Sequence, residues 1–144
     1  MSYSAVGLYG PKNGINIGGA MRAASCYGAS LVAIQATRAV KIRQPADTHH
    51  TYSHTPVVIC SDLFDVLPFD CVPIAVEFLD YAQDIREFKH PKRAMYIFGP
   101  EDGTLERKVL SKCRDIIQIP TVLCMNLAAT VNVVLYDRML KEKT

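Results

Sequence analysis

The chain has 144 residues with a net charge of +2; 49% of its residues are apolar and 21% are charged. This length and composition suit one domain with its own core and exclude a disordered chain. Because no run of eighteen apolar residues and no secretory signal occur, we expect a single soluble, cytoplasmic domain over residues 1–144 with no membrane partner.

Apolar stretches rich in strand-forming residues alternate with helical stretches along the chain. The predicted strands cover residues 4–9, 30–35, 72–77, 94–98 and 115–119. The predicted helices cover residues 17–27, 61–67, 105–112 and 126–142, with a polar loop at 38–55 and an irregular or helical piece at 81–88. Continuous apolar strands separated by helices indicate an α/β fold, in which helices cover both faces of a parallel sheet.

Three unusual stretches each come at the end of a predicted strand. They read GPKNGINIGGAMR, FGPEDGTL and IPTVLCMNLAATVNVVLYDR. In open parallel sheets, ligands bind beyond the carboxyl ends of the strands. We therefore expect the three stretches to meet at one edge of the sheet and to form a site there.

The first stretch contains one charged helical residue, Arg22. Its helical neighbours Gly18, Gly19, Ser25 and Cys26 are small and cannot pair with it, and no acidic residue lies within 24 positions along the chain. A guanidinium in such surroundings suits a phosphate or a developing oxyanion, and the glycines would leave room for such a group to approach it. A structural ion pair over a long sequence distance is the alternative.

Ordinary structural explanations exist for other residues of these stretches. Asn16 can cap the first helix, and Gly28 can end it. Gly99 lets a ligand approach the main chain and Glu101 projects into the crevice, although the same segment could be a simple strand–turn–helix connection capped by Thr104.

The third stretch leads into the last helix. Pro120 ends the strand, residues 121–125 form an apolar loop, and Asn126 is placed to cap the helix. That helix is apolar almost all round, which indicates that it packs on more than its own sheet and predicts a homodimer.

Basic residues are concentrated in the N-terminal third of the chain. The first 46 residues carry five basic residues and no acidic ones, and the remainder carries 11 basic and 14 acidic residues. This asymmetry favours a polyanionic partner, with chance as the alternative. In the loop at 38–55, Arg38, Lys41 and Arg43 could bind phosphates and Tyr52 could stack on bases, unless the loop is only a mobile polar connection.

No metal site is expected. His49, His50 and His54 with Asp47 fit no familiar ligand spacing. The five cysteines lie far apart without a C-x-x-C pair, which favours small buried thiols over a zinc or redox motif; they are Cys26, Cys60, Cys71, Cys113 and Cys124.

Taken together, the three stretches resemble the SpoU/TrmH branch of the SPOUT RNA methyltransferases, most closely its compact TrmL-like members. The matching residues lie in the family's order along the chain: Asn16, Gly18 and Arg22; Phe98, Gly99, Glu101 and Gly103; and Ile119, Pro120, Cys124, Met125, Asn126, Tyr136 and Asp137. Two departures are that Cys124 replaces the family's serine and that the loop between Pro120 and Asn126 is about three residues shorter than in TrmL-like relatives.

The resemblance implies a C-terminal deep trefoil knot, a homodimer with the site at the subunit interface, and methylation of a ribose 2′-hydroxyl in RNA, with tRNA and perhaps its wobble position as the target. It implies S-adenosylmethionine as the cofactor, held by Val76, Gly99, Gly103, Ile119, Cys124, Met125, Asn126 and Leu127. The implied catalytic residues are Arg22, Asn16 and Glu101, and the implied RNA-binding residues are Arg22, Arg38, Lys41 and Arg43.

The role of Arg22 stays open between electrostatic activation, which we favour because arginine remains protonated in proteins, and the general-base role proposed for the family. Three other functions remain alternatives: methylation of rRNA ribose, methylation of a base, and an inactive RNA-binding module that has kept the fold.

Overall fold

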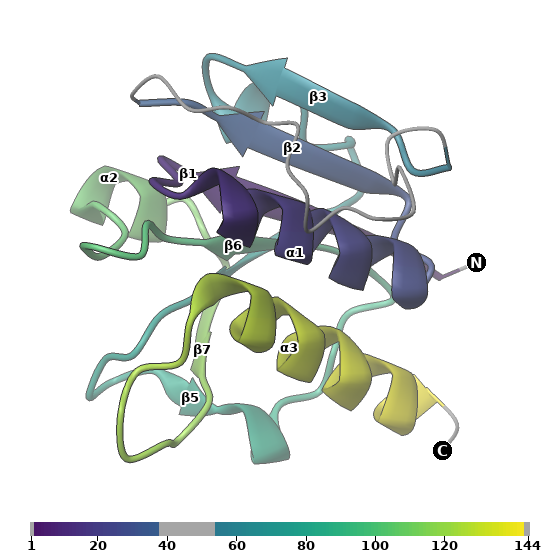
Figure 1. Cartoon of the computed structure of the whole chain (residues 1–144). Coiled ribbons are helices and arrows are strands. Elements are labelled where there is room, and N and C mark those ends of the chain that lie inside the picture. The colour runs from purple at the N-terminus through teal and green to yellow at the C-terminus, as the bar shows by residue number, and fades with distance from the viewer. Residues whose placement is uncertain (1, 38–53, 143–144) are drawn as a thin grey trace.

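The computed structural model describes residues 2–37 and 54–142 (Figure 1). Within these ranges seven strands form one sheet in the order β3-β2-β1-β6-β4-β7-β5, and every neighbouring pair is parallel. The strands are β1 (Tyr3–Tyr9), β2 (Leu31–Gln35), β3 (Val57–Cys60), β4 (Val72–Val76), β5 (Gln83–Asp84), β6 (Arg93–Phe98) and β7 (Asp115–Gln118). The α-helices are α1 (Gly14–Cys26), α2 (Arg107–Leu110) and α3 (Leu127–Glu142).

The predicted parallel α/β architecture is confirmed, and the differences lie in short elements. The edge strands β3 and β5 were missed, because β5 is two polar residues long and β3 is four residues long beside a polar loop. The predicted helix at 61–67 is only a 3-10 turn at Leu63–Asp65. Helix α2 is shorter than the predicted 105–112, and Thr104 does not cap it, since Glu106 occupies the N-cap position.

Side chains alternate between the two faces of the sheet, and both faces are buried. On β1, Val6 and Leu8 pack in a core shared with α1 and α3, whereas Ala5 and Tyr9 pack in a second core with Leu63 and with residues of α2. Helices α1 and α3 lie side by side on the first face (Figure 1). Burial of both faces explains why the central strands read as continuous apolar runs.

A glycine sets the distance between α1 and α3. A Cβ atom added to Gly19 would lie 2.8 Å from Cβ of Ala128, closer than side chains tolerate, and Gly18 is buried. The interpretation of these glycines as room for an incoming group is therefore wrong for Gly19, which is small because α3 packs against it.

A chain of buried hydrogen bonds fixes the C-terminal half of α3 to the sheet. Nη1 of Arg138 donates to the hydroxyl of Tyr96 (3.0 Å), which lies 2.6 Å from Nδ1 of His90, and Nε2 of His90 lies 2.7 Å from Oδ2 of Asp137. Because the Asp137 carboxylate only accepts, the assigned tautomer has Nε2 donating to it and Nδ1 accepting from Tyr96. Asp137 also pairs with Lys141 (2.8 Å).

Burial shifts the pKa values of this network. Desolvation raises the pKa of Tyr96 to about 12, against the opposing effect of Arg138. Desolvation also lowers the pKa of His90, although the hydrogen bond to Asp137 opposes this shift. The phenol and the imidazole are thus neutral at pH 7, and Asp137, which matched the last motif, anchors α3 here.

Among the described residues, no helix combines the length and apolarity that a membrane crossing requires.

Candidate functional site

A pocket lies at the carboxyl ends of β4, β6 and β7, where the sequence predicted that loops would meet. Val76 ends β4, Phe98 ends β6 and Gln118 ends β7, and all three line the pocket. Residues of the loop after β7 and the first turns of α3 complete it. The site is therefore built from segments far apart in sequence, brought together because the parallel strands end at one edge.

Most residues that the family resemblance assigned to the cofactor line this pocket. They are Val76, Gly99, Gly103, Ile119, Cys124, Met125 and Leu127. Asn126 does not line it. Its Oδ1 accepts a hydrogen bond from the amide of Ala129 (2.8 Å), so Asn126 caps α3 as the sequence also predicted.

Glu101 joins the loop after β6 to the start of α1. Its Oε1 accepts from the amide of Lys12 (3.1 Å), and its Oε2 accepts from the amide of Asn13 (2.9 Å) and from Nδ2 of Asn16 (3.2 Å). Burial raises the pKa of Glu101, but the donors from Lys12, Asn13 and Asn16 outweigh it, so the pKa lies below its usual value. Glu101 is therefore an ionised carboxylate whose hydrogen bonds connect the first two motifs.

The cap of α1 is Asn13, and the prediction of Asn16 as cap is wrong. Oδ1 of Asn13 accepts from the amides of Ile15 (2.8 Å) and Asn16 (3.4 Å). The Asn16 side chain is thereby left to bind Glu101. The other end of α1 follows the prediction, since Gly28 takes a φ of 70° directly after the helix cap Tyr27.

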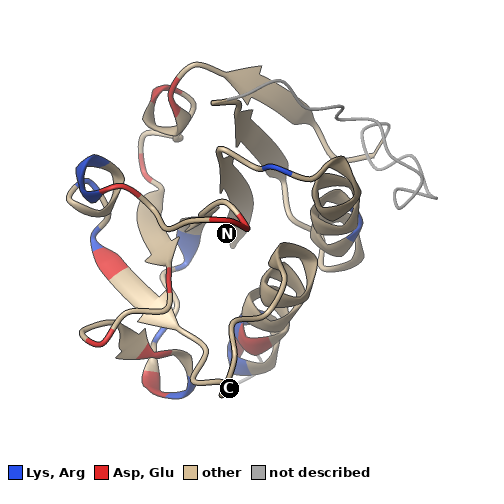
Figure 2. Ribbon diagram, turned by 60° about the vertical axis from the view of Figure 1, so that its left-hand side comes forward, with Lys and Arg blue, Asp and Glu red and all other residues tan. Residues whose placement is uncertain are grey.

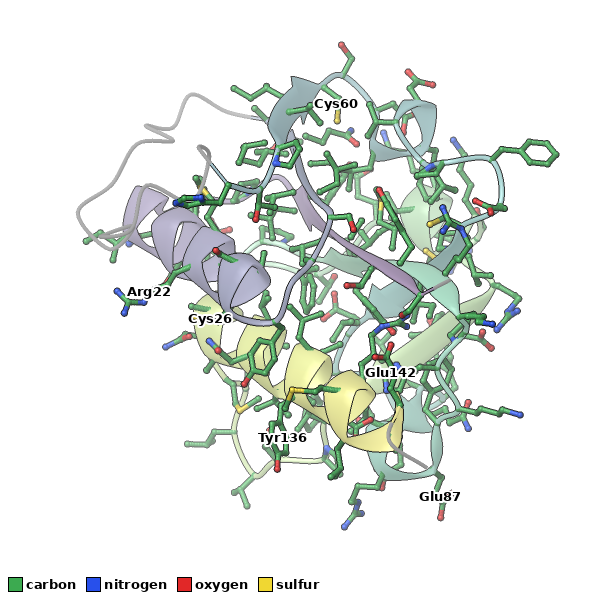
Figure 3. All side chains as sticks on the ribbon, turned by 90° about the vertical axis from the view of Figure 1, so that its right-hand side faces the viewer. Arg22, Cys26, Cys60, Glu87, Tyr136 and Glu142 are labelled. Carbon is green, nitrogen blue, oxygen red and sulfur yellow. The ribbon has the colours of Figure 1, made fainter. Side chains whose placement is uncertain are left out.

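Arg22 is exposed on α1 and does not line the pocket of its own chain. Figure 3 shows its side chain projecting away from the body of the molecule. The expectation that it would lack a partner does not hold, because Arg22 takes part in an interaction in the structure. Arg22 and the pocket therefore lie on separate parts of one chain.

Gly99 is small because protein atoms fill the space beside it. A Cβ added there would lie 3.1 Å from Oε2 of Glu77 and 3.2 Å from the amide nitrogen of Leu105. The sequence interpretation assigned that space to a ligand. Glu77 itself, a pocket residue that sequence reasoning missed, follows directly on the apolar strand β4. Its signal was the acidic residue at the carboxyl end of a buried strand.

Several predicted binding residues lie outside the described part of the chain. They are Arg38, Lys41, Arg43, Asp47, His49, His50 and Tyr52. In the described ranges, no group of three or more His, Cys, Asp or Glu side chains is arranged to hold a metal ion.

The sequence model of the SpoU rRNA Methylase family matches residues 4–136. The chain belongs to this family. Among curated proteins, no sequence matches it significantly.

Solved structures of SpoU proteins share the fold at low sequence identity. The SpoU methyltransferase AviRb from Streptomyces viridochromogenes superposes with a TM-score of 0.85 at 17% identity, over 98% of this chain but 60% of AviRb. A TrmH/SpoU tRNA modifying enzyme from A. aeolicus gives a TM-score of 0.85 at 16% identity, over 99% of this chain and 78% of the enzyme. A structure described for 2-OH methylation of C/U34 on tRNA gives 0.83 at 19% identity, over 100% of this chain and 93% of the other.

Proposed function

We propose that this chain is an S-adenosylmethionine-dependent RNA methyltransferase that methylates a ribose 2′-hydroxyl. The observation that carries the proposal is that the second and third motif stretches, which follow β6 and β7, line one pocket together with the end of β4 in a chain of the SpoU rRNA Methylase family. One neighbouring structure, AviRb from Streptomyces viridochromogenes, is described in complex with the cofactor AdoMet, which agrees with this assignment.

The residues of the pocket fit such a cofactor. Phe98, Ile119 and Leu127 supply apolar surface for a purine ring, and the carboxylates of Glu77 and Glu101 supply negative charge for a cationic cofactor. When bound, S-adenosylmethionine supplies an electrophilic methyl group, whose transfer leaves a neutral thioether as the ribose hydroxyl loses its proton. We assign the cofactor to the pocket residues Val76, Gly99, Gly103, Ile119, Cys124, Met125 and Leu127, with Asn126 holding the start of α3.

We assign catalysis to Arg22, with Asn16 and Glu101 as positioning residues. The hydrogen bond between Asn16 and Glu101 fixes the N-terminal part of the helix that carries Arg22. A guanidinium beside the ribose stabilises negative charge as it develops on the 2′-oxygen and binds the neighbouring phosphate. Arg38, Lys41 and Arg43 would extend this RNA contact.

Because Arg22 does not line the pocket of its own chain, the proposal requires a homodimer in which Arg22 of the partner subunit serves this pocket. Exposed apolar side chains on α3 support the packing of a second copy of the chain against this helix. Tyr136 is 49%, Met139 45% and Leu140 52% exposed. Figure 2 shows α1 and the N-terminal half of α3 almost free of charged residues, and Figure 3 shows Tyr136 projecting outward.

For the RNA target we favour tRNA, including its wobble position. This chain covers 93% of the length of the neighbour described for 2-OH methylation of C/U34 on tRNA, but only 60% of the length of AviRb. Methylation of rRNA is the second candidate, favoured by the description of the family model. An inactive RNA-binding module is the third, because Cys124 stands where the family has serine. The C-terminal trefoil knot, which the family resemblance implies, also stays a prediction.

The test is to incubate the purified protein with bulk RNA and labelled cofactor and to map any 2′-O-methylated nucleotide. We expect Arg22→Ala to abolish transfer while calorimetry still detects S-adenosylmethionine binding. Loss of both in a folded variant would contradict the role given to Arg22. Failure of the wild-type protein to bind the cofactor would reject the enzyme and leave the RNA-binding module.

A further inference from the structure

The charged groups that line the pocket are all acidic. Glu77 and Glu101 contribute carboxylates, and no lysine, arginine or histidine of the described ranges is among the lining residues. Lys12, whose backbone amide donates to Glu101, has its Nζ 4.0 Å from Oδ2 of Asp102. A ligand in the pocket therefore meets a negative field from at least two side chains.

Glu77 directly follows β4, and two backbone amides hold its carboxylate in place. Its Oε2 accepts from the amide of Leu105 (2.8 Å) and its Oε1 accepts from its own neighbour Phe78 (3.2 Å). The missing Cβ of Gly99 leaves the room that the carboxylate occupies. These bonds orient the group without neutralising it, and no described Lys or Arg forms an ion pair with it.

Two amide donors leave part of the acceptor capacity of Glu77 unused, since a carboxylate offers about four lone-pair sites. An ionised group held in this way discriminates between ligands by charge. The methyl donor carries a positive sulfonium, whereas the product of transfer carries an uncharged thioether at the same atom. A fixed negative charge near the sulfur lowers the free energy of the first complex more than that of the second.

Resting on the proposed function, we infer that Glu77 is the specificity-determining residue by which the pocket binds the sulfonium donor more tightly than the thioether product. Glu77 would thereby promote exchange of spent for fresh cofactor after each transfer. At a separation of several ångströms in a partly solvated site, one such charge changes the affinity ratio by about tenfold.

Calorimetry with three probes tests the inference on the wild-type protein. The probes are S-adenosylmethionine, S-adenosylhomocysteine and sinefungin, in which a positively charged amine replaces the sulfonium methyl centre. We expect the two cationic probes to bind more tightly than S-adenosylhomocysteine. Equal affinity of all three would overturn the inference while leaving the cofactor assignment intact, and binding of none would reject the proposed function together with it.

The variant Glu77→Gln then identifies the residue. Its amide oxygen can still accept from Leu105, so we expect a folded protein, checked by its circular dichroism spectrum. The ratio of the two affinities, donor over thioether product, should fall about tenfold, mainly through weaker donor binding. Glu106→Gln is the matched control, because Glu106 lies outside the pocket with Lys108 at 3.3 Å, and its ratio should not change. A ratio unchanged in Glu77→Gln, or changed equally in both variants, would overturn the inference.

Discussion

Replacing Arg138 by methionine tests whether the buried guanidinium holds the end of α3 on the sheet. Arg138 is 4% exposed. Its Nη1 donates to the carbonyl of Pro91 (2.7 Å) and the hydroxyl of Tyr96 (3.0 Å), and its Nη2 donates to the carbonyl of Lys92 (2.8 Å). Methionine keeps the apolar stem and removes every donor together with the ion pair to Glu142 (3.1 Å), so the effect separates these polar interactions from the packing.

The expected loss follows from what each acceptor retains. The carbonyl of Lys92 keeps the amide of Tyr3 (3.0 Å), and the hydroxyl of Tyr96 still donates to His90 (2.6 Å), but the Tyr96 oxygen and the carbonyl of Pro91 both lose the donor from Arg138. A buried acceptor left unsatisfied costs about 1–3 kcal/mol. Adding the lost hydrogen bonds from a charged donor, we expect the free energy of unfolding to fall by about 3–5 kcal/mol.

Urea denaturation followed by circular dichroism measures this loss, with Arg86→Met as the control. Nη2 of Arg86 lies only 2.6 Å from Oδ2 of Asp84, but the side chain is 74% exposed. Water replaces an exposed ion pair, so we expect no measurable loss there. A loss below about 1 kcal/mol for Arg138→Met, or equal losses in the two variants, would refute the argument that burial decides the contribution.

Two further variants examine packing and protonation. Gly19→Ala places its Cβ 2.8 Å from Cβ of Ala128, so it should lower the free energy of unfolding by about 1–3 kcal/mol. Adding Ala128→Gly in the same chain should restore most of this loss. Additive effects of the two substitutions in denaturation curves would contradict the contact. Burial lowers the pKa of His90 from 6.5, so below about pH 6.5 the unfolded chain binds one more proton at this residue than the folded chain. The free energy of unfolding therefore decreases as the pH is lowered, by at most about 1.4 kcal/mol per pH unit. This slope should be shallower in His90→Gln, and an unchanged slope in melts from pH 7 to 5 would count against a buried neutral imidazole.

Local sequence signals predicted the strands and helix ends that are determined by residues close together in the sequence. The apolar runs that became β1, β4 and β6 are long enough to identify buried strands, and Asn126 and Gly28 mark helix ends by chemistry that acts within a few residues. The two edge strands β3 and β5 lacked such a signal. The Gln-Asp pair of β5 has little strand preference, so its pairing depends on its neighbour β7, whereas Val57, Val58 and Ile59 of β3 favour a strand in a run only four residues long.

The site divides along the same line. The motif stretches follow strands of one parallel sheet, so the sequence predicted the edge at which the pocket lies, although only the second and third stretches line it. The positions of individual side chains needed the tertiary structure. By residue type, Asn13 and Asn16 are equally suited to cap α1. In the structure Asn13 is the cap, and the side chain of Asn16 instead donates to Glu101, which is 85 residues away in the sequence.

From the sequence by itself came the parallel sheet, the edge that carries the pocket and the family resemblance, because periodicity, helix caps and motif order are properties of neighbouring residues. Only the folded chain decided that Gly19 belongs to a helix contact, that Asp137 anchors α3, and that Glu77 lines the pocket. Each of these depends on an atom dozens of residues away, and no local pattern records such a distance.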